Sequence, residues 1–314
     1  MKVLVTGAAG NVGAHTCRAL LDAGHEVRGM DLPSRAARRV AARLDGAEFA
    51  WGDITNPGAI AEAVKGVQAI VHLAAVLPPA SEQRPELAEA VILDGTRLLL
   101  EASSAGPRPP RFVLASSVAV YGARPITSPP VGPGDPCDPV DTYGRLKVQA
   151  EALVQARADS AVLRLGAVPP LSASQDLDPY FFTIPFENPI HAVHPMDAGR
   201  AFARAVEADL GDRPLLVAGG EGWRMTYGAL VGALFEAAGV GALPAEAFRP
   251  LSEGGPAPVG WMDTTEAQER LGFQTRSLER YLSDLAPILG VRRTAARWLR
   301  PLARRFVLRL SPYL

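Results

Sequence analysis

The stretch that determines the fold is KVLVTGAAGNVG, residues 2–13. Its first half is a short apolar run, typical of a buried strand, and its second half opens a helical pattern. The glycines at GxxGxxG spacing are Gly7, Gly10 and Gly13. In such a turn the first glycine permits the tight bend, the second lets the backbone approach a pyrophosphate, and the third lets the helix pack on the strand. Strand, turn and helix in succession predict a dinucleotide site rather than a turn that binds nothing.

The first half of the chain repeats this alternation of short apolar runs and helical patterns. Strands are expected at 2–7, 26–31, 47–53, 69–75, 111–117 and 161–166, and helices at 11–23, 34–44, 57–65, 85–104 and 142–157. Buried strands separated by helices indicate βαβ units and a parallel sheet. The fold class is therefore expected to be α/β, with a doubly wound parallel Rossmann sheet and a smaller C-terminal substrate domain.

Asp31 ends the second strand, 18 residues after Gly13. An acid near this distance accepts hydrogen bonds from the ribose hydroxyls of a dinucleotide and repels a 2′-phosphate, so NAD is the expected cofactor. Four nearby arginines could bind such a phosphate instead, which keeps NADP open: Arg28, Arg35, Arg38 and Arg39.

The pattern becomes irregular after residue 166 and returns to the sheet later. A short strand near 191, a helix that begins at Asp197, a strand in PLLVAGG (214–220) and a helix that ends at Gly239 are expected. We therefore expect two domains. The NAD-binding Rossmann domain comprises 1–165 plus about 191–219, and the substrate domain comprises 166–190 plus 220–314.

The composition narrows the classes of protein further. Of 314 residues, 48% are hydrophobic and 21% charged, as in a soluble globular protein, and the net charge of −1 gives no reason to expect nucleic acid. Cys17 and Cys137 stand in no metal or redox spacing, so we expect no metal site and a reducing, cytoplasmic location. The N-terminal apolar run is too short for a signal peptide and no run approaches a membrane span, so no membrane partner is expected.

Polar residues stand where several predicted strands end. Asp53 follows the third strand, HLAA (72–75) the fourth, and Ser116 and Ser117 end the fifth. Open α/β sheets bind ligands at this carboxyl edge. We interpret His72 as a packed, hydrogen-bonded histidine rather than a catalytic one.

A second motif lies in DTYGRLKVQAE, residues 141–151. Tyr143 and Lys147 are four residues apart and share one face of the predicted helix. An ammonium beside a phenol favours the phenolate, so Lys147 is expected to lower the pKa of Tyr143. Such a pair can pass a proton to or from an oxygen, although a lone YxxxK also occurs by chance.

Together these motifs resemble the extended short-chain dehydrogenase/reductases, the NAD-dependent epimerase/dehydratase family. The order of TGAAGNVG, Asp31, GDI with Asp53, HLAA, SSVAVYG (116–122) and YGRLK is similar to that of the family, over roughly residues 1–235. The resemblance implies that Tyr143 is the catalytic acid/base, that Lys147 binds the nicotinamide ribose, and that Ser117 hydrogen-bonds the reacting oxygen. It implies that the remaining cofactor-binding residues are Gly7, Gly10, Asn11, Val12, Gly13, Asp31, Asp53, Ile54, Leu73, Ala74 and Ala75.

The chain also departs from the family pattern. Ile92 stands where the family often has an asparagine, and Val118 and Ala119 replace an acidic pair of the 4,6-dehydratases, which argues against elimination of water from a sugar. The segment 167–190 is short for one that grips a nucleotide. Its apolar and aromatic residues are Leu171, Leu177, Tyr180, Phe181, Phe182, Ile184 and Phe186. They either cover the sheet or form a pocket for a less polar substrate.

The resemblance implies an NAD(P)-dependent oxidoreductase that transfers hydride reversibly at a carbinol or carbonyl carbon. We expect a dehydrogenase or ketoreductase acting on a small, non-nucleotide molecule. A nucleotide-sugar epimerase with tightly held NAD is the alternative, and a non-catalytic NAD-sensing protein is a more remote one.

The C-terminal segment 291–314 carries seven arginines and no acid, and the rest of the chain carries 25 basic and 33 acidic residues, a net charge of −8. Apolar residues at helical spacing are Ala295, Trp298, Leu299, Leu302 and Phe306, and Pro301 is expected to divide the segment or to open its second helix. The segment can be a cap on the substrate domain, an element of a homodimer, or a membrane-surface anchor. We expect a cap that walls the substrate pocket together with 171–186.

Overall fold

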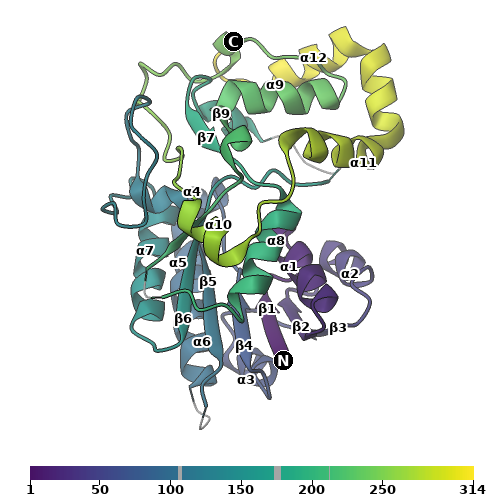
Figure 1. Cartoon of the computed structure of the whole chain (residues 1–314). Helices are drawn as coiled ribbons and strands as arrows, with labels where there is room; N and C mark the ends of the chain where they lie inside the picture. The colour runs from purple at the N-terminus through teal and green to yellow at the C-terminus, as the bar shows by residue number, and fades with distance from the viewer. Residues whose placement is uncertain (105–107, 173–177, 212) are drawn as a thin grey trace.

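The computed structural model describes residues 1–104, 108–172, 178–211 and 213–314. At its centre lies a parallel sheet of seven strands in the order β3-β2-β1-β4-β5-β6-β8 (Figure 1). The strands are β1 (Lys2–Thr6), β2 (Glu26–Asp31), β3 (Ala47–Trp51), β4 (Ala69–His72), β5 (Arg111–Ser117), β6 (Ser160–Leu165) and β8 (Leu215–Val217). The order reverses direction between β1 and β4, the point at which doubly wound sheets bind ligands. The expected Rossmann sheet is confirmed.

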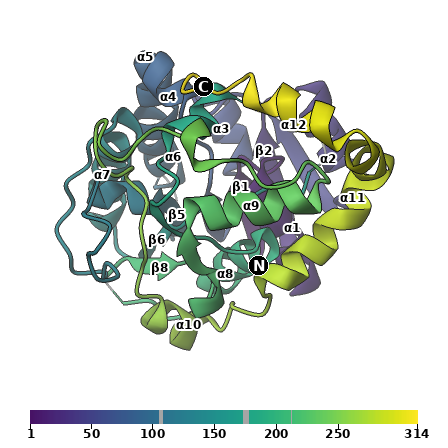
Figure 2. The ribbon, with the colours of Figure 1, turned by 90° about the horizontal axis from the view of Figure 1, so that it is seen from above.

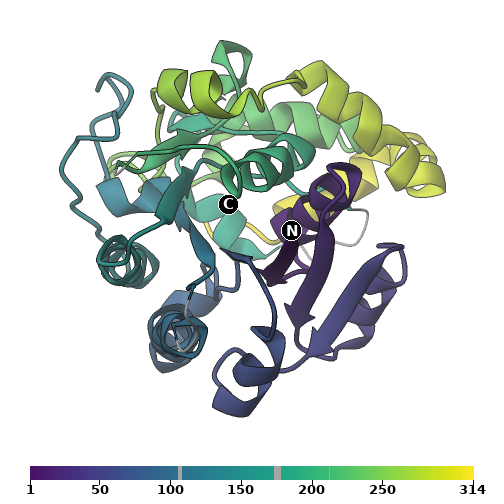
Figure 3. The same cartoon turned by 60° about the horizontal axis from the view of Figure 1, so that its bottom comes forward.

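Helices cover both faces of the sheet (Figure 3). One face carries α1 (Asn11–Asp22), α8 (Pro195–Ala205) and α10 (Thr265–Leu271), whose apolar residues share one core cluster. The other carries α3 (Pro57–Ala63), α6 (Gly95–Ser103) and α7 (Thr142–Gln155) in a second cluster. The short α2 (Arg35–Ala41) connects β2 to β3.

Local sequence explains where several helices begin. Asp141 accepts a hydrogen bond from the Gly144 backbone N–H and caps α7, and Asn56 caps α3 in the same way ahead of Pro57. Helix α8 begins at Pro195 and not at Asp197, because His194 is its N-cap and proline suits the first turn. Asp197 instead accepts hydrogen bonds from Thr275 and Arg276.

The helix expected at 85–104 is divided. It consists of α5 (Pro85–Glu89), a π-helical segment (Ala90–Asp94) and α6, and a short helix α4 (Ala80–Gln83) precedes them. A π-helical turn holds more residues than an α-helical one, so it changes the side of the helix on which the preceding residues lie. Hydrophobic periodicity alone does not reveal such a shift.

A smaller lobe lies above the carboxyl edge of the sheet (Figure 1). It contains the antiparallel pair β7 (Pro189–His191) and β9 (Arg224–Thr226), with α9 (Tyr227–Ala237), α11 (Leu278–Trp298) and α12 (Arg300–Leu308). Short 3-10 turns are Val118–Tyr121, Pro179–Thr183, Glu221–Trp223 and Ala245–Ala247. A separate core cluster, rich in aromatic residues, holds the lobe together. We propose the two-domain division on this basis, except that α10, which the sequence assigned to the substrate domain, packs against the sheet.

None of the helices in the described part of the chain combines the length and the apolar character needed to cross a bilayer.

Candidate active site

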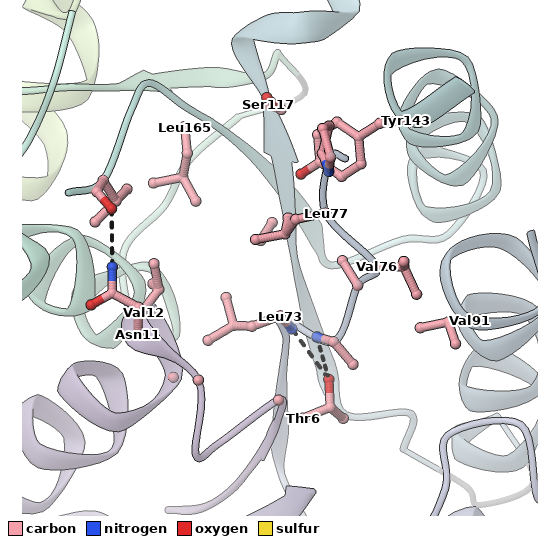
Figure 4. Close-up of a pocket in the computed structure, with 18 of the residues that line it drawn as sticks. Thr6, Asn11, Val12, Leu73, Val76, Leu77, Val91, Ser117, Tyr143 and Leu165 are labelled. Atoms are coloured by element: carbon pink, nitrogen blue, oxygen red, sulfur yellow. Dashed lines mark hydrogen bonds between the residues drawn. The ribbon is translucent and has the colours of Figure 1, made fainter. Parts of the chain in front are cut away.

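One elongated cavity of about 870 Å³ follows the carboxyl edge of the sheet. Every residue for which the sequence predicted a catalytic or cofactor-binding role lines it, including the glycine loop, Asp31 and Tyr143. Figure 4 shows part of this cavity. Asn11 and Val12, which follow β1, lie on one side of it, and Ser117 of β5 and Tyr143 of α7 lie on the other. The topology thus brings together residues that are more than 100 positions apart in the sequence.

The glycine loop is held closely against its neighbours. Gly7 adopts a positive φ of 65°, and a Cβ atom there would lie 3.0 Å from the Ala74 backbone nitrogen. A Cβ atom on Gly13 would lie only 2.0 Å from the Gly7 carbonyl oxygen. Helix α1 can therefore begin directly beneath the loop only because residue 13 has no side chain. The Asn11 side-chain amide donates to the Val168 carbonyl oxygen at 3.0 Å and ties the loop to the segment after β6 (Figure 4).

Asp31 lies at the edge of this loop. Its carboxylate accepts hydrogen bonds from the backbone N–H groups of Ala9 and Leu32, both at 2.8 Å. These bonds orient the acid at the cavity wall, where it is only partly buried.

The arginines near Asp31 are engaged elsewhere or lie off the cavity. Arg28 is buried and donates to the carbonyl oxygens of Ala63 and Lys65, both at 2.8 Å. The guanidinium of Arg38 stacks over the Trp51 ring, 4.9 Å from its centroid. Arg35 and Arg39 do not line the cavity either. The described residues thus offer no guanidinium inside the cavity to hold a 2′-phosphate.

The end of β4 is fixed by a buried hydrogen-bond chain. The Thr6 hydroxyl accepts from the backbone N–H groups of Leu73 and Ala74, and it is also bonded to His72 Nδ1 at 2.6 Å (Figure 4 shows the two backbone bonds). His72 Nε2 is bonded to the Thr96 hydroxyl at 3.0 Å, and burial lowers the pKa of His72 to about 3. His72 is therefore packed and hydrogen-bonded at both ring nitrogens, as the sequence predicted.

Asp53 follows β3, the strand next to the one that ends at Asp31, and accepts from the Thr55 N–H and hydroxyl. Ile54 packs under Gly95. Both residues line the cavity together with Leu73, Ala74 and Ala75.

Ser117, Tyr143 and Lys147 meet in the middle of the cavity. The Ser117 side chain lies close to that of Tyr143, and its hydroxyl accepts a hydrogen bond from the Ala119 N–H at 3.2 Å. The Lys147 ammonium donates to the Ala115 carbonyl oxygen at 2.8 Å and lies 5.7 Å from the centroid of the Tyr143 ring. The side-by-side placement that the i, i+4 spacing predicted is present.

The expected effect of Lys147 on Tyr143 is wrong for this structure. The pKa of Tyr143 is raised above its ordinary value, because burial disfavours the phenolate more strongly than the Ser117 hydrogen bond favours it. Lys147 is 2% exposed, and burial lowers its pKa to about 8 against the opposing charge of Glu151. Desolvation, which the sequence spacing cannot show, thus exceeds the attraction between the pair.

The buried ammonium predicts a pH-dependent contribution to stability. Between pH 8 and the ordinary lysine range the unfolded chain binds the Lys147 proton and the folded chain does not, so stability rises with pH. We expect the unfolding free energy of the wild type to rise relative to that of Lys147→Met between pH 7 and pH 10. Urea unfolding at both pH values measures it. The control is Lys65→Met, at an exposed position; an equal shift there, or none at Lys147, would contradict the expectation.

Sequence reasoning missed two supporting groups. Glu82 of α4 accepts from the backbone N–H groups of Thr142 and Tyr143, at 3.0 and 3.2 Å, and no local pattern pointed to it. Glu151 forms a buried ion pair with Arg164 at 2.6 Å and also accepts from the Ser116 hydroxyl. Because Glu151 follows Lys147 by four residues on α7, its spacing could have revealed it. Ser116 and Ser117 both line the cavity, and the Ser116 hydroxyl is engaged by Glu151.

The rest of the cavity is largely apolar, although Asp141 also lines it. Its walls include Val76, Leu77, Leu87, Val91, Tyr180, Ile184, Ala257, Pro258 and Val259. Of the apolar residues predicted for 171–186, Tyr180 and Ile184 line the cavity, whereas Leu171, Phe181, Phe182 and Phe186 pack in the core of the smaller lobe. Leu177 lies outside the described residues. The segment therefore contributes both to the core of the smaller lobe and to the wall of the cavity.

The expectation that the C-terminal tail walls this pocket is wrong. No residue after Val259 in the described chain lines the cavity. In the view from above, α11 and α12 run alongside α9 and around one end of it (Figure 2). Trp298 is 85% exposed, and Leu302 and Phe306 are 64% and 67% exposed.

The comparisons with known proteins agree with this geometry. The family model described as the NAD dependent epimerase/dehydratase family matches residues 3–169. The chain is 38% identical over 155 residues to the sterol demethylase protein B of Methylococcus capsulatus. This alignment covers 48% of this chain and 45% of that protein. It is 34% identical over 215 residues to the 3 beta-hydroxysteroid dehydrogenase/Delta 5-->4-isomerase of Mycobacterium tuberculosis, covering 65% of this chain and 55% of that protein. The alignments thus span about half the length of these two relatives.

Among solved structures, the UDP-glucuronic acid 4-epimerase of Bacillus cereus in complex with UDP-glucuronic acid and NAD has the same fold. Its TM-score is 0.76 at 22% identity, over 92% of this chain and 99% of that one. The chain belongs to the NAD dependent epimerase/dehydratase family. This family has NAD as its cofactor, and it includes both dehydrogenases and epimerases.

Proposed function

We propose that this protein is an NAD-dependent dehydrogenase or ketoreductase that acts on an apolar, non-nucleotide alcohol or ketone. The glycine loop fits the pyrophosphate of NAD. At Gly7 and Gly13 a side chain would collide with the backbone, so only glycine allows the tight bend and the close packing of strand and helix that such a loop needs. Asp31 would accept from the adenosine ribose, and Asp53 and Ile54 would lie beside the adenine. Bound NAD would accept the hydride, or NADH would supply it.

The proton would pass through Tyr143. In the reductive direction its phenol donates a proton to the substrate oxygen, and in the oxidative direction the phenolate takes that proton back. Ser117 donates a hydrogen bond to the same oxygen and stabilises the charge that develops there. Lys147 would hold the nicotinamide ribose. The raised pKa of Tyr143 suits the acid role of the reductive direction.

The observation that carries the substrate proposal is the character of the cavity beyond Tyr143. A nucleotide sugar brings a doubly negative pyrophosphate, which proteins usually meet with arginine or lysine. Lys147 is the one cationic residue among those described as lining the cavity, and it would be engaged by the cofactor. An apolar wall instead favours a substrate that gains free energy by leaving water.

The relatives lend this proposal further support. Two of them are named for sterol or steroid chemistry, which involves large apolar alcohols and ketones. The alternative is an epimerase that retains its NAD, as the similarity of fold to a nucleotide-sugar epimerase would allow.

Release of nucleotide from the purified protein distinguishes the two functions. A dehydrogenase exchanges its cofactor in each turnover, so we expect the denatured protein to release less than one nucleotide per chain, and labelled NAD to exchange freely before denaturation. One tightly held, non-exchanging NAD per chain, together with interconversion of UDP-hexoses, would establish the epimerase instead. Tight NAD without any turnover of alcohols or sugars would favour the sensing protein.

We predict that Asp31 sets a preference for NAD over NADP. Its carboxylate would repel a 2′-phosphate, and no described arginine inside the cavity would attract one. Asp31→Ala should narrow the preference, measured by competition titrations with both cofactors. Asp31→Asn keeps an acceptor for the Ala9 N–H without the charge and is the matched comparison. If NADP binds the unmutated protein more tightly than NAD, the prediction is wrong.

A further inference from the structure

The outer face of the C-terminal tail leaves large apolar side chains in solvent. We define the tail arm as residues 291–309, which comprise the end of α11 and all of α12. Its exposed apolar side chains are Val291 and Trp298, each 85% exposed, Leu299 at 55%, Leu302 at 64% and Phe306 at 67%. Leu302 and Phe306 are four residues apart and so lie on one face of α12. Single exposed leucines are common on protein surfaces, but a run that includes a tryptophan and a phenylalanine marks an interaction site.

The inner face of the tail arm is already packed, so the outer face is held in place. Ala296, Ala303 and Val307 belong to the core cluster of the smaller lobe. Gly239 and Gly241 of the loop after α9 approach Arg297 and Arg300 so closely that a Cβ atom would lie 2.7 Å or less from their side chains. The Arg300 guanidinium also forms an ion pair with Glu236 at 2.7 Å. The arm is therefore part of the folded lobe, with its apolar outer residues displayed on a fixed support.

The tail arm itself carries charge of one sign only. The last acidic residue of the chain is Asp284, and seven arginines follow it. In the described part of the chain no carboxylate oxygen lies within 4 Å of the guanidinium groups of Arg297, Arg304, Arg305 or Arg309. Arg305 follows Leu302 by three residues and Arg309 follows Phe306 by three, so arginines and apolar side chains interleave on the exposed side of α12.

A shallow groove lies beside these arginines. Its volume is about 580 Å³, and it is lined by Pro301, Arg304, Arg305, Leu308, Arg309, Ser311 and Leu314. Three guanidinium groups with two leucines form a surface that suits an anionic head group joined to a hydrocarbon chain.

We propose that the tail arm docks on the surface of a bilayer that contains anionic phospholipid. The apolar side chains enter the interfacial region, the arginines contact lipid phosphates, and Trp298 lies at the boundary that its amphipathic ring prefers. A second copy of the chain is a poorer occupant, because a symmetric contact would bring two sets of unpaired arginines together. Of the roles that the sequence left open for this segment, the proposal takes the membrane-surface anchor, because the structure leaves the apolar stripe of the tail uncovered. It does not depend on the proposed substrate.

Vesicle sedimentation with the full chain tests the proposal. We expect binding to phosphatidylcholine vesicles that contain phosphatidylserine, weaker binding as salt rises, and little binding to phosphatidylcholine alone. The variant Arg304→Gln/Arg305→Gln/Arg309→Gln should weaken binding by about 100-fold, since each basic residue near such a surface contributes about fivefold. Trp298→Ala/Phe306→Ala should also weaken it while leaving all charges in place.

A matched control removes three arginines from exposed positions elsewhere: Arg43→Gln/Arg84→Gln/Arg108→Gln. It should retain nearly all of the binding. The proposal is overturned if the wild type does not bind anionic vesicles, or if the control loses as much binding as the tail variant, since net charge would then explain the effect. It is equally overturned if sedimentation without lipid shows a dimer that Trp298→Ala/Phe306→Ala dissociates, because a second copy would then cover this face. Circular dichroism confirms that each variant is folded.

Discussion

Tyr143→Phe is expected to lower turnover by about 10²–10⁴-fold, the usual effect of removing a positioned acid/base, while the affinity for NAD stays close to that of the wild type. The phenyl ring would keep its packing in the core cluster between α7 and the sheet, so the variant removes little more than the hydroxyl that faces Ser117. The cofactor is held chiefly by the glycine loop, Asp31 and Lys147 in this account. Steady-state kinetics and a binding titration with NAD measure the two quantities separately.

Tyr180→Phe is the matched control for this prediction. Tyr180 lines the same cavity and loses the same hydroxyl, but it is not bonded to Ser117. We expect it to change turnover far less than Tyr143→Phe does. Wild-type turnover in the Tyr143 variant would remove the residue from its proposed role, whatever the control shows.

Gly13→Ala is expected to weaken NAD binding by about 10- to 100-fold. The new methyl group would lie 2.0 Å from the Gly7 carbonyl oxygen, so the loop must move away from the position that the strand and helix now fix. Forcing an extra methyl into a packed site usually costs about 1–3 kcal/mol, and each 1.4 kcal/mol corresponds to about tenfold in affinity. Isothermal titration with NAD measures the effect directly.

Gly232→Ala provides the comparison. Gly232 also lies inside a helix, α9, but a Cβ atom there would meet nothing within 4 Å. Alanine should be tolerated or should stabilise that helix slightly. If both variants bind NAD as the wild type does, the loop does not hold the pyrophosphate in the way proposed here.

The parts of the site that could be predicted from sequence are those that short motifs determine. The glycine spacing after β1 requires a strand, a bend and a helix in immediate succession, so it placed Gly7 and Gly13 correctly. The strand ends at Asp31 and Ser117 follow from the rule that parallel strands present one edge to a ligand. All of these residues reach the same cavity because the sheet order returns them to one edge.

The other features depend on packing between distant segments. The raised pKa of Tyr143 follows from burial that only the folded chain reveals. The sequence shows clearly that the tail arm has an apolar stripe. In the structure, however, it is the alanine-rich side of the arm, and not this stripe, that packs against the rest of the smaller lobe. Alanine and glycine allow the arm to approach closely there, and Trp298 is consequently left in solvent.

The most direct test of the central claim is the reduction of NAD by the purified protein in the presence of apolar secondary alcohols, followed through the absorbance of the reduced nicotinamide. We expect NADH to accumulate with sterol-like alcohols, the corresponding ketone to form in equal amount, and Tyr143→Phe to abolish both. We expect no comparable reaction with UDP-hexoses. Epimerisation of a UDP-hexose without net NADH formation, together with no oxidation of any apolar alcohol, would contradict the central claim.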